Sequence, residues 1–284
     1  VLDTCTGSGG FLMEAMEMMI ELAHGDEEKI KNIKEKQLIG FEIDSVLFAL
    51  ACSNMFLHGD GRTNLLYRSS LLNTNKGSIV NSDDNELLKY IRSMKPTKVI
   101  INPPYENNNA IKFTKQALEY LEPNGKLIII MPTPTLTHNQ DGLTEKILEI
   151  AKLDFVIRMP FNLFSEQKRI VNTSIFGFTK TPHSKNDDVL FYKLEDDGFI
   201  SVQHKGRIDR NNKWSEKEMQ IIDAIFNMKE IDDVSQKKKI YKNNMLNCAG
   251  FAEKKQRNYE SVKLSTLFYL DEKGSLASEK ADDS

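Results

Sequence analysis

Residues Asn102 to Tyr105 have the types and spacing that suit chemistry on a planar amine. They spell Asn-Pro-Pro-Tyr and directly follow the apolar run Val99 to Ile101, which is typical of a buried strand. The two prolines fix the backbone and remove two N–H donors, so the Asn102 side-chain oxygen and the Pro103 carbonyl are left to accept hydrogens from an amino group. Tyr105 adds a flat face on which a base can stack. The predicted catalytic residues are Asn102, Pro103, Pro104 and Tyr105, and a plain proline turn is the alternative.

A glycine-rich turn lies near the start of the chain. Gly7-Ser8-Gly9-Gly10 follows the apolar stub Val1-Leu2-Asp3 and precedes a stretch that predicts a helix. Glycine lets a ligand approach the backbone closely, and the first N–H groups of the helix face the same place. Such turns also bind dinucleotides or simply reverse the chain, so the pattern alone leaves these alternatives open.

Glu42 ends a second predicted strand, 37–42. An acid at this position can accept the two hydroxyls of a ribose. It can equally be a charge favoured by the dipole of the following helix, beside Asp44. Both interpretations stay open on the sequence alone.

The elements that must position these motifs alternate between strand and helix. We predict strands at 37–42, within 64–71, and at 98–101, 126–131, 155–159, 172–179 and 189–193, and helices at 9–24, 45–57, 110–121, 143–151 and 214–227. Residues 26–36 are expected to form a charged loop with a helical extension, and residues 73–86 a polar loop. This alternation predicts an α/β layered sheet, with the glycine turn and the Asn-Pro-Pro-Tyr loop at one sheet edge. The pair favours methyl transfer onto a planar amine, with adenine in DNA as the leading acceptor.

Composition is that of an ordinary globular protein. The chain has 284 residues, 40% of them hydrophobic and 28% charged, and contains no run of eighteen apolar residues that could span a membrane. Its three cysteines are far apart, which argues against structural zinc or a disulfide framework and favours the reducing cytoplasm. The net charge of −3 suggests that another subunit provides much of any grip on DNA.

We expect a soft domain boundary near Pro182. Residues 1–182 would form the catalytic domain, and residues 183–284 a C-terminal extension of mixed strand and helix with a frayed tail from Ser275. Only Val1 and Leu2 precede Asp3, where a strand of this kind usually has five or six residues. We therefore expect the N-terminal part of the catalytic domain to be truncated.

Taken as an ordered set, the motifs resemble the adenine-specific DNA methyltransferases, and most closely the modification (M) subunit of type I restriction-modification systems. The matching stretches are 3–12, 40–44, 50–59, 102–105, 123–126 with 131–132, and 156–160 with Phe164 and 172–175. The resemblance implies a Rossmann-like, S-adenosylmethionine-dependent methyltransferase sheet with an antiparallel seventh strand, plus a mixed C-terminal appendage. It also implies methyl transfer from S-adenosylmethionine to a flipped adenine at N6.

The resemblance assigns cofactor contacts residue by residue. Asp3 would hold the methionine amino group, Glu42 the ribose hydroxyls, and Ile43 would pack on the adenine of the cofactor. The implied cofactor-binding residues are Asp3, Thr6, Gly7, Gly9, Gly10, Phe11, Glu42, Ile43, Ser69, Ser70 and Leu71, and no metal site is expected. One departure is that Arg68-Ser69-Ser70-Leu71 stands where the family usually has Gly-Asp-x-Leu, so an uncharged serine replaces the acid.

The implied partners are double-stranded DNA and a separate specificity subunit, and a restriction subunit is left open. The sequence leaves two other functions open. A protein glutamine N5-methyltransferase would share the Asn-Pro-Pro-Tyr motif. A non-catalytic assembly subunit with a decayed cofactor site would explain Ser69.

Overall fold

The computed structural model describes the side chains of residues 1–59, 64–71, 84–106, 109–136, 142–161, 163, 171–202 and 206–240, and the backbone of 82–83, 268–270 and 276–278. The chain divides into two compact units, Val1–Ala249 and Gly250–Ser284. In the described residues of the second unit, β12 (Phe268–Leu270) pairs antiparallel with β13 (Leu276–Ser278).

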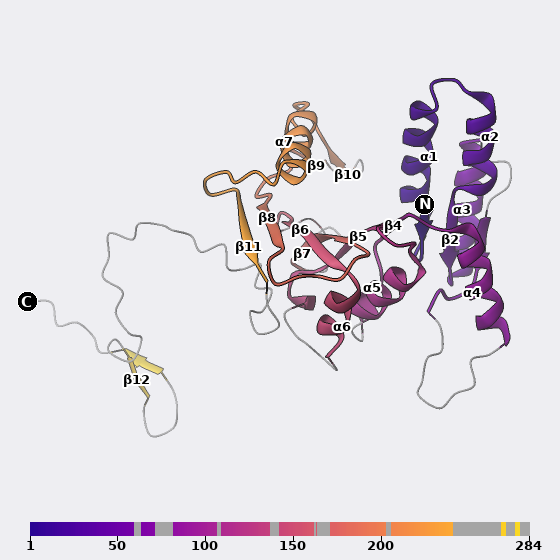
Figure 1. Cartoon of the computed structure of the whole chain (residues 1–284). Coiled ribbons are helices and arrows are strands. Elements are labelled where there is room, and N and C mark those ends of the chain that lie inside the picture. The colour runs from indigo at the N-terminus through magenta and orange to yellow at the C-terminus, as the bar shows by residue number, and fades with distance from the viewer. Residues whose placement is uncertain are drawn as a thin grey trace, which may run out of the picture. The chain divides into compact units, whose positions relative to one another are not determined.

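A single nine-stranded sheet organises the first unit, with the strand order β11-β8-β6-β7-β5-β4-β1-β2-β3 (Figure 1). Its strands are β1 (Leu2–Asp3), β2 (Ile39–Glu42), β3 (Asn64–Tyr67), β4 (Lys98–Ile101), β5 (Lys126–Pro132), β6 (Lys152–Arg158), β7 (Thr173–Thr179), β8 (Asp188–Lys193) and β11 (Ser235–Lys239). Strands β1 to β5 are mutually parallel, whereas β7 runs antiparallel to both β5 and β6. The predicted α/β sheet with an antiparallel seventh strand is therefore confirmed, and the edge strand β11 also runs antiparallel to its neighbour β8.

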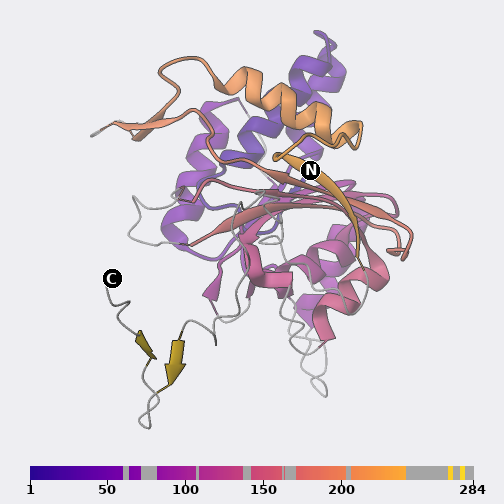
Figure 2. The same cartoon turned by 90° about the vertical axis from the view of Figure 1, so that its left-hand side faces the viewer.

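Helices cover both faces of this sheet. They are α1 (Gly10–Leu22), α2 (Glu27–Lys36), α3 (Ser45–Leu57), α4 (Ser82–Met94), α5 (Asn109–Tyr120), α6 (Leu143–Ile150) and α7 (Trp214–Phe226), with a short 3-10 turn, η2, at Thr133–Leu136. Figure 2 shows α7 on one face and α5 and α6 on the opposite face. No helix in the described part of the chain is long and apolar enough to cross a membrane.

The strand order reverses direction between β1 and β4. From β1 the chain builds outward through β2 to β3, and β4 then returns to pair with the other side of β1. Leu2 pairs with Val99 of β4 and with Ile39 of β2, so β1 lies between them. Ligands of open α/β sheets bind outside the carboxyl ends of the strands at such a reversal. This point is where the fold places the candidate site.

Two stretches differ from the expectation of loops. Residues Glu27–Lys36 form a complete helix, because the Asp26 side chain accepts a hydrogen bond from the Lys29 N–H at 3.1 Å and caps it. Acidic residues in its first turn and lysines in its last also favour the helix dipole. The polar stretch expected as a loop up to residue 86 becomes helical from Ser82, and residues 72–81 lie outside the described part.

The sheet continues past Pro182. Strand β8 pairs with β6, and β11 pairs with β8, whereas β9 (Ile200–Val202) and β10 (Gly206–Ile208) form a separate hairpin. Leu190 and Tyr192 of β8 pack with Ile221 and Ala224 of α7 in one buried cluster. Much of the expected C-terminal extension thus shares the sheet and core of the first unit.

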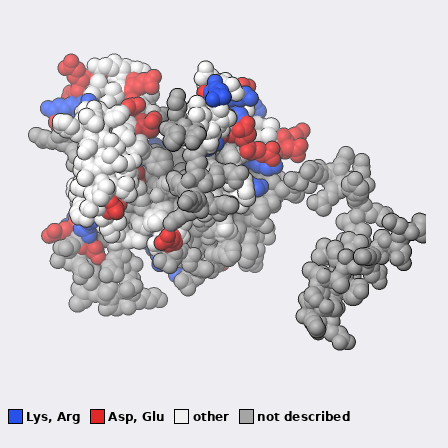
Figure 3. Space-filling model, turned by 180° about the vertical axis from the view of Figure 1, so that it is seen from behind, with Lys and Arg blue, Asp and Glu red and all other residues white. Residues whose placement is uncertain are grey.

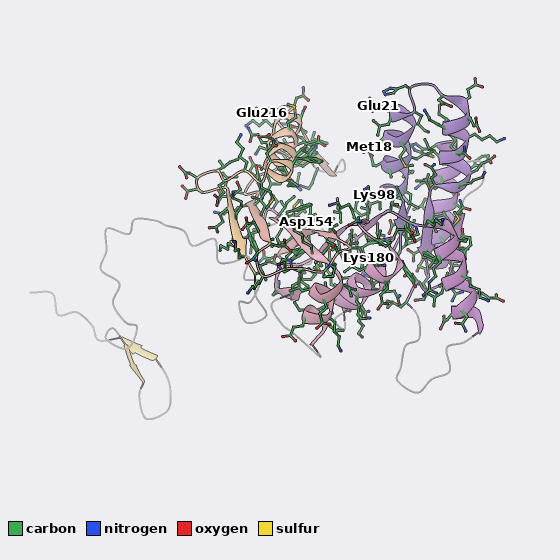
Figure 4. The ribbon with its side chains drawn as sticks, viewed as in Figure 1. Met18, Glu21, Lys98, Asp154, Lys180 and Glu216 are labelled. Carbon is green, nitrogen blue, oxygen red and sulfur yellow. The ribbon has the colours of Figure 1, made fainter. Side chains whose placement is uncertain are left out.

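The amino-terminal edge of the central strands carries a charged network. Asp154 accepts a hydrogen bond of 2.5 Å from the Thr179 hydroxyl and lies 3.6 Å from the Lys126 ammonium. The Lys180 ammonium donates to the Glu119 and Leu121 carbonyls at the end of α5. Asp154 and Lys180 are labelled in Figure 4. The charged groups at this edge pair with one another and with backbone carbonyls. The candidate site lies at the opposite, carboxyl-terminal edge of the strands.

Helix α3 is unusual in containing no charged residue. Large apolar side chains on it are nevertheless exposed, including Val46, Leu50, Phe56 and Leu57. Figure 3 shows a broad uncharged area on the part of the molecule built by the N-terminal helices, with acidic and basic side chains at its margins.

Candidate active site

Three neighbouring parallel strands bring the predicted motifs to one edge. Asn102 follows β4, Asp3 ends β1 and Glu42 ends β2, in the order β4-β1-β2 across the sheet. The glycine turn therefore lies between the Asn-Pro-Pro-Tyr loop and Glu42. Adjacent strands are about 4.8 Å apart, so groups on these three loops can contact one small ligand.

The Asn-Pro-Pro-Tyr loop holds an internal hydrogen bond. The Tyr105 hydroxyl donates to Oδ1 of Asn102 at 2.8 Å. Pro103 is buried, Tyr105 is half-buried, and Asn102 and Pro104 are exposed. Burial raises the pKa of Tyr105 to about 12, which keeps its hydroxyl protonated as a donor. An amide oxygen can accept two hydrogen bonds, so Asn102 retains one acceptor position for a ligand amine.

The glycine turn uses the backbone freedom that its residues provide. Gly7 and Gly9 have φ values of +56° and +89°, in the left-handed region that side chains disfavour. Gly9 is also the N-cap of α1, and no side chain caps this helix. The N–H groups of the first turn, from Gly10 and the half-buried Phe11 onward, are thus not covered by a capping side chain.

Asp3 is buried at the base of this turn, with 1% of its surface exposed. Its Oδ1 accepts a hydrogen bond from the Cys5 N–H at 2.9 Å, whereas Oδ2 has no partner among the described residues. Burial raises the pKa of Asp3 to about 7; the Cys5 hydrogen bond opposes the rise and the charge of Glu42 adds to it. A buried carboxylate oxygen without a partner is a position for a cationic or N–H-bearing ligand.

Glu42 fastens the glycine turn. Its Oε2 accepts from the Gly7 N–H, and its Oε1 from the N–H groups of Ile43 and Asp44, each at 2.8 Å. A carboxylate offers about four acceptor positions, so one remains, on Oε2. Asp44, rather than Glu42, caps α3 by accepting from the Val46 and Leu47 N–H groups. Ile43 stands exposed beside this carboxylate.

The segment after β3 forms hydrogen bonds within itself and to the glycine turn. Ser69 Oγ accepts a hydrogen bond from the Leu71 N–H at 3.2 Å, within the segment itself. Ser70 is buried, and its hydroxyl donates to the Thr4 carbonyl at 2.9 Å. Thr6 is also buried and donates through Oγ1 to the Asp3 carbonyl at 3.2 Å. Ser70 and Thr6 thus support the turn from within.

Two supporting residues were not among the predicted site residues, although both lie in stretches that carry the family resemblance. Asn54 of α3 donates through Nδ2 to the Ser8 carbonyl at 2.9 Å, and the single amide in an uncharged helix is the signal that could have identified it. Gly40 lies in β2, where a Cβ atom would come within 2.6 Å of the Thr6 hydroxyl and 2.4 Å of the Leu65 side chain. Its small size lets β2 pack closely against the turn.

The sequence of the chain, including these loops, matches one protein family over most of its length. The model of the N-6 DNA methylase family matches residues 1–264. The chain belongs to the N-6 DNA methylase family.

The chain is also similar to one curated relative. The type II restriction enzyme and methyltransferase RM.BcgI of Heyndrickxia coagulans is 31% identical over 230 residues, which cover 77% of this chain and 34% of the relative. The chain therefore spans about a third of that protein.

Two solved structures share its fold. A structure of a type I restriction-modification system, described for its complex assembly and conformational transition, has a TM-score of 0.63 at 20% identity and covers 84% of this chain and 50% of its own. The type I methyltransferase subunit of Streptococcus thermophilus has a TM-score of 0.57 at 19% identity, with 84% and 50% coverage.

The residues of this site fit a cofactor that contains an amino-acid part and a sugar. The orphaned Asp3 oxygen suits an ammonium group, the uncapped start of α1 suits a carboxylate, and the free acceptor on Glu42 suits a sugar hydroxyl. Among the residues that the structure describes, no three His, Cys, Asp or Glu side chains gather into a possible metal site.

Proposed function

We propose that this chain is the catalytic part of a DNA adenine N6-methyltransferase that takes its methyl group from S-adenosylmethionine. The observation that carries the proposal is the pairing of β1 with β4, which makes the glycine turn and the Asn-Pro-Pro-Tyr loop neighbours at one sheet edge. A donor pocket beside an amine-holding loop is the arrangement that methyl transfer requires, because the reacting atoms must be held close and in line.

Asp3, the glycine turn and Glu42 would hold the cofactor. Asp3 Oδ2 would accept from the ammonium of its methionine part, and the first N–H groups of α1 would face its carboxylate. Glu42 would accept one ribose hydroxyl through Oε2, and Ile43 would pack on the adenine ring. When bound, S-adenosylmethionine supplies an electrophilic methyl group on a sulfonium. Ser69 and Ser70 would act as support, not as direct contacts.

The Asn-Pro-Pro-Tyr loop would hold the target amine. Asn102 Oδ1 and the Pro103 carbonyl would each accept one hydrogen from the adenine N6 amino group, which directs the nitrogen lone pair out of the ring plane. Tyr105 would stack on the base, a contact worth about 1–3 kcal/mol. The loop has no carboxylate or imidazole, so positioning and exclusion of water are its contribution. The adenine has to leave the DNA helix to reach the loop.

We propose that DNA recognition involves further protein parts. The net charge of −3 gives little general attraction for phosphate. The structural neighbours are type I modification subunits and complexes, which favours a separate specificity subunit. RM.BcgI is described as both a restriction enzyme and a methyltransferase. A restriction subunit or domain is therefore also proposed as a partner.

The test is transfer of labelled methyl from S-adenosylmethionine to duplex DNA by the protein, alone and with its specificity partner. Recovery of N6-methyladenine after nucleoside digestion supports the proposal. Label in protein glutamine would overturn it in favour of a glutamine methyltransferase. Absence of saturable S-adenosylmethionine binding in calorimetry, with and without the partner, would instead indicate an assembly subunit with a decayed site.

A further inference from the structure

Tyr120, Ser70 and the backbone of Thr4 form a buried chain of hydrogen bonds. Tyr120 is the last residue of α5, and its hydroxyl donates to the Ser70 carbonyl at 2.5 Å. The Ser70 hydroxyl then donates to the Thr4 carbonyl at 2.9 Å. The three residues are 4%, 2% and 4% exposed, so water does not compete for these bonds.

This chain connects loops that the sheet itself leaves apart. Strand β2 separates β1 from β3 in the sheet, so no ladder of backbone hydrogen bonds joins the turn after β1 to the segment after β3. The Ser70–Thr4 bond makes that connection directly, and Tyr120 anchors it to the helix that follows the Asn-Pro-Pro-Tyr loop. Two of the loops at the site and the end of α5 are therefore linked through one serine.

The connection bears on the site because β1 is very short. It contains only Leu2 and Asp3, and its pairing with β2 and β4 stops at Asp3. The position of the glycine turn beyond it depends on individual bonds. The Thr6 N–H donates to the Phe41 carbonyl and the Gly7 N–H to Glu42, and the Ser70 hydroxyl holds the Thr4 carbonyl next to Asp3. Burial raises the pKa of Tyr120, so its hydroxyl stays a donor and cannot become a phenolate.

We infer that Ser70 and Tyr120 are positioning residues for the methyl donor. They fix the backbone of Thr4. This also fixes the carboxylate of Asp3 and the start of the glycine turn in the position that cofactor binding requires. Ser70 thus affects cofactor binding by positioning the backbone of the turn. An acidic residue in this segment would instead contact the cofactor directly. The inference rests on the proposed function, since it assigns a role within the same cofactor site.

The test measures S-adenosylmethionine affinity by calorimetry for Tyr120→Phe, Ser70→Ala and the double variant, with the melting temperature of each. Each single variant is expected to raise the Kd about five- to tenfold at a temperature where the protein stays folded. The Kd of the double variant is expected to be no higher than the higher of the two single-variant Kd values, because Tyr120 acts through Ser70. Tyr192→Phe, another buried tyrosine, and Ser93→Ala, another hydroxyl bonded to a carbonyl, are the matched controls and should leave the Kd unchanged.

Two results would overturn the inference. One is a lowered melting temperature with an unchanged Kd, which would make the bonds purely structural. The other is an additive loss of affinity in the double variant, which would show that the two residues act independently. If the unsubstituted protein shows no saturable binding, with or without its partner, the proposed function fails. If it binds and the variants bind equally well, only the positioning role fails.

Discussion

The Tyr105 hydroxyl donates a 2.8 Å hydrogen bond to the same Asn102 oxygen that would receive the target amine. The bond holds the amide oxygen in a fixed orientation before a base arrives. It also fixes the tyrosine ring beside that oxygen, so that stacking and hydrogen bonding would occur at one place. The hydroxyl and the ring of Tyr105 therefore have separable roles.

Replacing the tyrosine separates these roles. Tyr105→Phe keeps the stacking face and frees the Asn102 oxygen, so we expect methyl transfer to DNA within about threefold of the unsubstituted rate. Tyr105→Ala removes the stack, worth about 1–3 kcal/mol, and should lower the rate by about 5- to 150-fold. Single-turnover methylation measures both. Equal losses in the two variants would contradict this division.

Substitution of Asn102 should reduce methylation of DNA and leave cofactor affinity unchanged. Asn102→Ala removes the exposed amide oxygen, so DNA methylation should fall by about a hundredfold or more, by comparison with the loss of other preorganised site groups. Its S-adenosylmethionine Kd should stay within about twofold, because Asp3 and Glu42 are untouched. Asn102→Asp keeps an acceptor at this place and should retain more activity than the alanine variant. Loss of cofactor binding in Asn102→Ala would refute the assignment.

Cofactor affinity should depend on pH through Asp3. Its pKa of about 7 means that the carboxylate, the form that attracts an ammonium group, is mostly absent at pH 6 and mostly present at pH 8. We expect the S-adenosylmethionine Kd to fall about tenfold over this interval, in proportion to the ionised fraction. Calorimetry across the range tests this, with Asp3→Asn as the control that should bind weakly and without this dependence.

The same carboxyl should make folding stability depend on pH. The pKa of Asp3 is about 7 when folded and 3.8 as a free group. Between these values the folded protein keeps a proton that the unfolded chain has released. The contribution is therefore complete below pH 3.8 and is lost as the pH rises through 7. Relative to Asp3→Asn, the unsubstituted protein should lose on the order of 3 kcal/mol between pH 5 and pH 8. Parallel urea-unfolding profiles for the two proteins would show that the pKa is ordinary.

Gly40 should tolerate no side chain. In Gly40→Ala the new methyl would lie 2.4 Å from Leu65 and 2.6 Å from Thr6, and such overpacking destabilises by about 1–3 kcal/mol. Gly10→Ala is the matched control, because no atom lies within 4 Å of its Cβ position and its φ is not left-handed. Alanine at the start of a helix should leave stability unchanged or raise it. Chemical unfolding measures both, and equal losses would contradict the packing argument.

The sequence predicted the shared edge of the two motifs because strand direction follows from alternating strands and helices. Asn102 and Asp3 each end an apolar run, and that was sufficient to place them. The helix at Glu27–Lys36 was predicted only as a loop with a helical extension, because seven of its ten residues are charged and its stability comes from the Asp26 cap and the dipole. The bond from Tyr120 to Ser70 was beyond prediction, because fifty positions separate the two residues and only tertiary packing brings them together.

The uncharged surface of α3 has a consequence for how the protein behaves in solution. Val46, Phe56 and Leu57 are each more than 70% exposed, so water is ordered around several neighbouring apolar groups. The purified protein should self-associate more strongly as sulfate concentration rises, whereas urea at non-denaturing levels should disperse it. Light scattering should accompany every titration described above, because colloidal association through α3 would consume protein without any change at the methyl-transfer site.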